Sequence, residues 1–266
     1  MINLKKNEQE LTNEVMNKIS LSKDKAKLEK HVVNLSKCVV DLSKKVDIDL
    51  GGIKAKVVLV LDYSGSMSNL YRNGTVQETI NRLVPLGLTF DDNGSIDAYL
   101  FKTDYRKFDD ITLGNYEDYV NKVIDKSGYR MGGTKYSPVL NAIITNENGK
   151  SNGGVLSKLF SSKNNSEKKG NEDEITFVLF ITDGENSDSS ATDEVIRESA
   201  KKKYKTFIQF IGIGDEKFKY LRKLDDLDDR EADNTGFSKM QDLKRASDKE
   251  LYNNVLGQFA EWLKLI

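Results

Sequence analysis

Residues 56–68 constrain the fold more than any other part of the chain. They open with an almost unbroken run of β-branched and apolar residues at 57–61. Such a run is typical of a strand buried on both faces of a parallel sheet. Asp62, Ser64 and Ser66 follow at alternate positions. Ligands of open α/β sheets bind beyond the carboxyl ends of the strands, so these three side chains lie where a site is expected.

The same pattern recurs further along the chain. Strands are followed by helical patterns throughout residues 57–266, which predicts an α/β fold with a mostly parallel central sheet and helices on both faces. The remaining predicted strands are 95–101, 108–113 at an edge, 175–181 and 206–213. The predicted helices are one within 69–88 that Pro85 kinks or ends, then 116–125, one after the glycine loop 129–138, 192–202, 218–224 and 248–265. Residues 145–174 are polar and predict a surface insertion around one short helix.

The N-terminal segment predicts a Lys-rich helical extension. Apolar residues recur in it every seven positions, at Leu21, Leu28, Leu35 and Leu42. This predicts an amphipathic helix over 22–46, which we expect to pack on its own domain because three heptads are short for a coiled coil. Residues 1–20 predict a frayed or loose helix, and Gly51-Gly52 predicts a linker. We therefore divide the chain into an extension, 1–52, and a domain, 53–266.

Composition excludes several kinds of chemistry. Lys and Arg number 41 against 42 Asp and Glu, so no bulk charge draws the chain to nucleic acid or a membrane. The single histidine, His31, lies in the extension, where a Ser-His-Asp or Cys-His mechanism could not easily use it. With one cysteine, Cys38, neither an intramolecular disulfide nor a Cys/His zinc site can form. No signal peptide or apolar span is evident, so we expect a cytoplasmic protein.

Three loops near the ends of predicted strands each bring oxygen ligands. The first is the Asp62-x-Ser64-x-Ser66 loop, the second carries Gly133-Thr134, and the third is Thr182-Asp183-Gly184. Hydroxyl and carboxylate oxygens are hard donors, which suit Mg²⁺, Mn²⁺ or Ca²⁺ better than a soft metal. The three loops together predict a divalent-cation site.

In this order and on this strand pattern, the three loops resemble the metal-ion-dependent adhesion site (MIDAS) of von Willebrand factor A (VWA) domains, which have a Rossmann-like fold. The resemblance covers about residues 53–266. Several stretches look like the VWA domain of TerF-type tellurium-resistance proteins of bacteria. These stretches are 71–77, 82–86, 90–94, 132–138, 209–214 and 221–227.

The resemblance implies a role for each residue. Ser64, Ser66 and Thr134 would ligate the metal directly, while Asp62 and Asp183 would supply negative charge directly or through water. A Glu or Asp carboxylate from a partner protein would complete the metal shell. The implied function is a non-catalytic, metal-dependent protein-binding module in a bacterial tellurium-resistance or stress-response assembly.

Other interpretations compete with this one. A Mg²⁺-dependent phosphatase or phosphotransferase could use a similar sheet, but the first strand ends in Asp-Tyr-Ser rather than Asp-x-Asp, and no P-loop is present. An RNA-associated scaffold would rely on the Lys-rich extension, although no basic-aromatic stripe occurs in 57–266. Thr134 could instead cap a helix, and Glu185 and Asn186 could tune the site or merely line a loop. Finally, Tyr63, Tyr71 and Tyr136 could form a rim around the metal or pack in the core.

Overall fold

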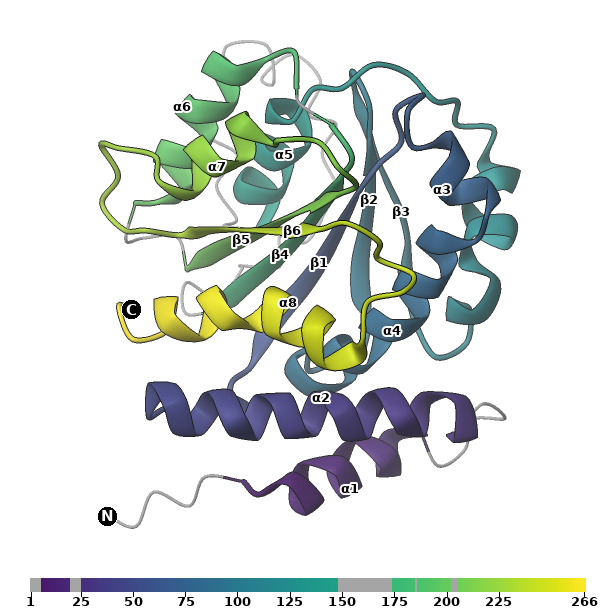
Figure 1. Cartoon of the computed structure of the whole chain (residues 1–266), viewed down its shortest axis with the longest axis vertical. Coiled ribbons are helices and arrows are strands. Elements are labelled where there is room, and N and C mark those ends of the chain that lie inside the picture. The colour runs from purple at the N-terminus through teal and green to yellow at the C-terminus, as the bar shows by residue number, and fades with distance from the viewer. Residues whose placement is uncertain (1–5, 20–24, 148–173, 185, 202–204) are drawn as a thin grey trace, which may run out of the picture.

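A six-stranded sheet with the strand order β3-β2-β1-β4-β5-β6 forms the centre of the molecule (Figure 1). The computed structural model describes residues 6–19, 25–147, 174–184, 186–201 and 205–266. Only β3 runs antiparallel to its neighbour, β2, and every other pairing is parallel. The strands are β1 (Ala55–Asp62), β2 (Ile96–Phe101), β3 (Tyr105–Ile111), β4 (Ile175–Thr182), β5 (Thr206–Ile213) and β6 (Thr235–Met240). The predicted mostly parallel α/β fold is therefore confirmed.

Helices cover both faces of the sheet, as predicted (Figure 1). On one face lie α1 (Glu8–Ile19), α2 (Lys25–Val46), α4 (Thr75–Phe90) and α8 (Asp248–Trp262). On the other lie α5 (Ser137–Glu147), α6 (Ser189–Ser199) and α7 (Lys219–Asp225), while the short α3 (Ser68–Arg72) follows β1. Strand β1 shows why both faces are covered. Val57 and Leu59 enter the core beneath α4 and α8, whereas Val58 and Val60 enter the core beneath α5 to α7.

The central strands lie where the apolar runs predicted them, but β6 was not predicted. Its residues, Thr235 to Met240, show no alternation of apolar and polar side chains, and the strand includes Gly236 and the exposed Lys239. Because β6 is an edge strand, hydrogen bonding to β5 rather than burial of both faces defines it. A pattern search based on burial therefore misses it.

The helical extension is more ordered than the sequence suggested. Helix α2 packs on the domain as predicted, and its heptad positions from Leu28 to Val46 are buried against α8, α4 and α1. The loose helix predicted within residues 1–20 is wrong for 8–19, which form the regular helix α1. Leu11, Val15 and Ile19 of α1 are buried, and this packing stabilises a segment whose local pattern is weak. Gly51, predicted to belong to a linker, is buried in a 3₁₀ turn over Leu50–Gly52.

Pro85 does not end the helix in which it lies. Helix α4 continues through it to Phe90, so the predicted ending is wrong. The residues on both sides of the proline, including Leu83 and Leu86, are fully buried. That packing outweighs the one backbone hydrogen bond that proline removes.

The helix predicted at 116–125 is a succession of 3₁₀ and π-type turns over 116–127. Most of the insertion predicted at 145–174 lies outside the described residues.

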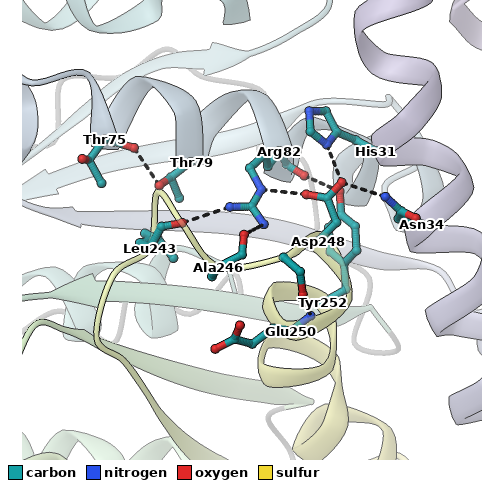
Figure 2. Close-up of polar contacts among 11 residues, drawn as sticks. His31, Asn34, Thr75, Thr79, Arg82, Leu243, Ala246, Asp248, Glu250 and Tyr252 are labelled. Atoms are coloured by element: carbon teal, nitrogen blue, oxygen red, sulfur yellow. Dashed lines mark hydrogen bonds and ion pairs between the residues drawn. The ribbon is translucent and has the colours of Figure 1, made fainter.

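A buried polar network joins the extension to the domain (Figure 2). The carboxylate of Asp248, the first residue of α8, accepts from Arg82 Nε at 2.8 Å and Asn34 Nδ2 at 2.9 Å, and lies 2.8 Å from His31 Nδ1. Arg82 also donates to the carbonyl oxygens of Leu243 and Ala246, each at 2.9 Å. The network therefore fixes α2, α4, the start of α8 and the connection that precedes it. His31 takes part in this network and not in the predicted site, as expected from its place in the extension.

Candidate metal centre

Asp62 lies at the base of the candidate site, as the last residue of β1. Its side chain is fully buried. Oδ1 accepts a hydrogen bond from the Ser64 backbone N–H at 2.7 Å, and Oδ2 accepts one from the Thr182 hydroxyl at 2.6 Å. Thr182 ends β4, the strand beside β1, so the parallel pairing of these strands positions both groups. Among the described residues, the groups that donate to this carboxylate are neutral.

A line of oxygen atoms leads from this base toward the surface. The Ser64 and Ser66 hydroxyl oxygens lie 3.0 Å apart, and Ser66 Oγ donates to Asp183 Oδ1 at 2.8 Å. Ser64 is buried, Ser66 is exposed and Asp183 is partly exposed. Four of the five predicted ligands are thus connected by a path of hydrogen bonds that opens to solvent at Ser66.

The fifth predicted ligand, Thr134, lies on a loop attached to the first one through the backbone. Ser64 and Gly132 form a parallel bridge, in which the Gly65 N–H donates to the Gly132 carbonyl at 3.1 Å. The Thr134 carbonyl accepts from the Ser187 N–H at 2.9 Å. Within the described part of the chain, no hydrogen bond involves the Thr134 hydroxyl. The structure therefore anchors the Thr134 backbone between the first and third loops.

The helix after Thr134 is capped by a different residue. Asp188, from the loop that follows β4, accepts from the backbone N–H groups of Tyr136 and Ser137, both at 3.0 Å. The alternative that Thr134 caps α5 is therefore wrong. Asp188 was not predicted as a site-building residue, because its partners lie 51 and 52 positions away and no local pattern marks it. Its cap links the second and third loops.

The electrostatics of the site follow from the burial of its two carboxylates. Burial raises the pKa of Asp62 to about 6, although hydrogen bonds from Ser64 and Thr182 oppose the rise. Burial also raises the pKa of Asp183, and the charge of Glu216 adds to the effect. Across the described ranges, no lysine, arginine or histidine forms an ion pair with either carboxylate. The site thus combines two partly desolvated carboxylates with no positive charge of its own.

The three tyrosines proposed as a rim do not form one. Tyr63, Tyr71 and Tyr136 are all buried. The Tyr71 hydroxyl donates to the Asp62 carbonyl at 3.0 Å, and the Tyr136 hydroxyl donates to the Gly184 carbonyl at 2.5 Å. Tyr71 and Tyr136 thus support the first and third loops, and the Tyr63 ring packs against Tyr71 and Tyr129. The core-packing alternative is therefore the correct one.

Asn186, which follows Asp183 in the third loop, forms hydrogen bonds within that loop and with α6. The Asn186 amide donates to Asp188 Oδ1 and to the Thr192 hydroxyl, each at 2.9 Å, which orders the start of α6. This favours the interpretation of Asn186 as a loop residue. Glu185 lies outside the described residues.

This donor set fits a hard divalent cation. Hydroxyl and carboxylate oxygens are the ligands that Mg²⁺ and Mn²⁺ prefer, and a buried carboxylate without a cation gains most from one. No group of three or more His, Cys, Asp or Glu side chains suited to a metal occurs among the described residues. The candidate site therefore depends on its hydroxyl groups as much as on its carboxylates.

The fold is that of a VWA domain. Residues 54–266 match the family described as "vWA-TerF-like: vWA found in TerF C terminus". The match covers most of the chain, so the protein belongs to the vWA-TerF-like family. This confirms the resemblance inferred from the sequence.

The chain is also similar to individual proteins. The chain is 33% identical over 214 residues to "Uncharacterized protein YcbR" of Bacillus subtilis (strain 168), a match that covers 80% of this chain and 79% of that protein. Its fold is similar to proximal thread matrix protein 1 from the mussel byssus, solved with a zinc-occupied MIDAS motif. That similarity has a TM-score of 0.51 at 15% identity, over 78% of this chain and 48% of the mussel chain.

A further solved structure, manganese-loaded TRAP of Plasmodium vivax, matches with a TM-score of 0.44 at 16% identity, over 70% of this chain and 68% of that one. The chain spans about half the length of the mussel protein, so the similarity to that protein concerns the fold alone.

None of the described helices combines the length and the apolar character needed to cross a bilayer.

Proposed function

We propose that this protein is a metal-dependent protein-binding module without catalytic activity. In this proposal Ser64, Ser66 and Thr134 ligate a divalent cation through their hydroxyl groups, and Asp62 and Asp183 supply negative charge. The cation is Mg²⁺, with Mn²⁺ or Ca²⁺ as substitutes. A Glu or Asp carboxylate of a partner protein occupies the remaining position in the metal shell.

The observation that carries the proposal is the state of Asp62. It is a fully buried carboxylate whose hydrogen-bond donors among the described residues are neutral, and hydrogen bonds connect its loop to an exposed hydroxyl, that of Ser66. Burying an uncompensated carboxylate costs several kcal/mol. A cation bound at the neighbouring oxygens removes that cost. With mostly neutral ligands, the bound ion also keeps its attraction for an incoming anion.

The absence of a catalytic apparatus supports a binding role over the phosphatase alternative. His31, the only histidine in the sequence, is bound to Asp248, and the residue two positions after Asp62 is a serine rather than a second aspartate. We also propose that the module works in the bacterial cytoplasm as part of a tellurium-resistance or stress-response assembly. The link to tellurium resistance rests on the family description alone. The cytoplasmic location is the expectation from the sequence.

Calorimetric titration with Mg²⁺ and Mn²⁺ tests the metal site. We expect binding by the wild type and its loss in Asp62→Ala and Asp183→Ala, with Asp242→Ala as the control, since Asp242 is an exposed carboxylate outside the site. Circular dichroism checks that each variant is folded. Unchanged binding in both site variants would contradict the proposed ligand set.

A matched pair of peptide pools tests the carboxylate. One pool carries a fixed glutamate with random flanks, and the other carries a fixed glutamine at the same position. We expect retention of the glutamate pool on immobilised protein in Mn²⁺ and its release by EDTA. Equal retention of the two pools, or retention that survives EDTA, would contradict a metal-completing carboxylate.

A further inference from the structure

Two exposed cations flank Thr134 on the second loop of the candidate metal centre. Arg130 and Lys135 are both exposed, and neither side chain forms an ion pair or a hydrogen bond with any residue that the structure describes. Gly132, which lies between them, is joined to the first loop by two backbone hydrogen bonds, of 3.1 and 3.2 Å. Both cations are therefore within three residues of a point where the second loop touches the first.

The connection from β2 to β3 adds two more cations beside this loop. The Lys135 N–H donates to the Lys102 carbonyl at 2.8 Å. The charged ends of Lys102 and Arg106 lie 4.8 and 4.7 Å from the centre of the Tyr129 ring. Lys102 is also 3.5 Å from the Asp104 carboxylate, whereas the contacts of the Arg106 guanidinium with described residues are two aromatic rings and a backbone carbonyl.

The charges of these two segments do not balance. Residues 102–106 carry two basic side chains and one carboxylate, and residues 125–135 carry three basic side chains and one carboxylate. Five positive and two negative charges leave a net charge of +3. Asp188, whose carboxylate accepts from N–H groups at the start of α5, lowers the local sum by one. We call residues 102–106 and 125–135 the basic patch.

The opposite side of the metal centre has no such excess of positive charge. Strand β5 lies on that side, and the connection that follows it carries two acidic and two basic side chains within residues 215–219. In the proposed function, the divalent cation balances the charges of Asp62 and Asp183. A ligand with a single carboxylate would therefore leave the basic patch uncompensated.

We propose that the basic patch receives a second carboxylate, from an Asp or Glu that accompanies the metal-binding residue in the same partner segment. The inference rests on the proposed function and specifies its ligand as an acidic segment. One carboxylate completes the metal shell, and the other pairs with Arg130 and Lys135. A guanidinium can hold a carboxylate through two parallel hydrogen bonds, and the lysine adds a point charge.

The positions of the two cations also limit the spacing of the two acidic residues. Arg130 lies two residues before Gly132, and Lys135 lies three residues after it. These separations correspond to at most about 7 and 10 Å along the chain. An extended peptide advances about 3.3 Å per residue. We therefore expect the second acidic residue within about three positions of the metal-binding one.

Sequencing the retained glutamate pool tests the proposal on the full chain in Mn²⁺. We expect Asp or Glu to be enriched at one or two positions within three residues of the fixed glutamate. A peptide made from the selected sequence should bind the double variant Arg130→Gln with Lys135→Gln about fivefold more weakly than the wild type. The matched control is Lys30→Gln with Lys37→Gln, which removes two exposed cations of α2 and should bind as the wild type does.

Salt and charge reversal sharpen the result. Raising the ionic strength from about 0.01 M to about 1 M shortens the Debye length from about 30 to about 3 Å, so the affinities of the wild type and the double variant should converge. Arg130→Glu with Lys135→Glu should select Lys or Arg where the wild type selects Asp or Glu. Circular dichroism and calorimetry with Mn²⁺ alone check that each variant is folded and binds the metal.

Three outcomes would overturn the inference. The first is a retained glutamate pool without enrichment of acidic residues, and the second is the same enrichment in the double variant. The third is retention of an oligothymidine that the double variant loses, without acidic enrichment, which would assign the basic patch to nucleic acid instead. Each of these leaves the metal site intact. If no glutamate peptide is retained in Mn²⁺, the proposed function fails, and this inference fails with it.

Discussion

Two buried aspartates in this molecule have opposite surroundings. Asp248 receives hydrogen bonds from Arg82 and Asn34 and contacts His31. The fold itself therefore supplies the positive charge that compensates this carboxylate. Asp62 is buried at least as deeply, but the hydrogen bonds that its carboxylate accepts from described residues come from neutral groups, the Ser64 N–H and the Thr182 hydroxyl. The pKa values of the two carboxyl groups move in opposite directions for this reason. The comparison separates a carboxylate that holds the fold together from one that, in our proposal, binds next to a cation.

The positions of the two groups match these roles. Asp248 joins α2, α4 and α8 in the interior of the helical layer, where no exchange with solvent is needed (Figure 2). Asp62 ends a central strand, at the sheet edge where loops reach the surface and Ser66 is exposed. A permanent partner suits the first location, and an exchangeable ion suits the second.

Asp248→Asn should give the largest effect. The substitution leaves the Arg82 guanidinium buried without its counter-charge, and breaking a buried pair in this way costs about 3–5 kcal/mol. Urea denaturation should show that loss in the free energy of unfolding. Asp242→Asn, which removes the partner of the exposed Arg245, should change it by less than about 0.5 kcal/mol. A loss no larger than that of the control would mean that the network contributes little.

The stabilities of the wild type and of Asp248→Asn should also depend differently on pH. Burial alone would raise the pKa of Asp248, but hydrogen bonds from His31 and Asn34 and the Arg82 charge outweigh it, so the pKa lies below its ordinary value. A carboxylate with a depressed folded-state pKa stabilises the protein above its unfolded-state pKa, about 3.9, and loses that contribution as the pH falls. The stability difference between wild type and Asp248→Asn should therefore shrink between about pH 5 and pH 3. A difference that grows on acidification would contradict this assignment.

Thr182→Val should have a smaller effect, at the other aspartate. It removes a donor to the buried Asp62 carboxylate while preserving side-chain shape, which should cost about 2 kcal/mol of unfolding free energy in the metal-free protein. Thr79→Val is the control, because the buried Thr79 hydroxyl donates to a neutral carbonyl, that of Thr75. We expect the control to lose about 1 kcal/mol or less. Equal losses would show that the Thr182 bond is an ordinary neutral one.

How far the sequence could predict the structure also differs between the two regions. The run at 57–61, its successors at 175–181 and 206–213, and the fold class follow from local patterns, because strands buried on both faces must be apolar throughout. The loops that bring oxygen ligands were predicted from the sequence, and the resemblance to VWA domains implied the ligand set. It stays a prediction, although hydrogen bonds link the loops that carry it.

The other region was not predictable in the same way. Asp248 binds residues more than 160 positions away. Arg82 opens one of the stretches that resemble TerF-type proteins, but no local pattern pairs Arg82 or His31 with Asp248. The regular helix α1, the cap by Asp188 and the edge strand β6 also depend on tertiary partners rather than on local pattern. Contacts between distant segments need the fold before they can be assigned.

The most direct test of the central claim compares wild type with Asp62→Asn, each unfolded by urea with and without Mn²⁺. The asparagine can keep both hydrogen bonds, because the Thr182 hydroxyl can reverse its role and accept. Without metal, we expect the variant to be as stable as the wild type or up to about 1 kcal/mol more stable, since a buried charge is removed. With Mn²⁺ at about 100 times its dissociation constant, the wild type should gain about 2.7 kcal/mol and the variant should gain almost nothing. A variant that is much less stable without metal, or that gains as much from Mn²⁺ as the wild type, would contradict the claim that Asp62 awaits a cation.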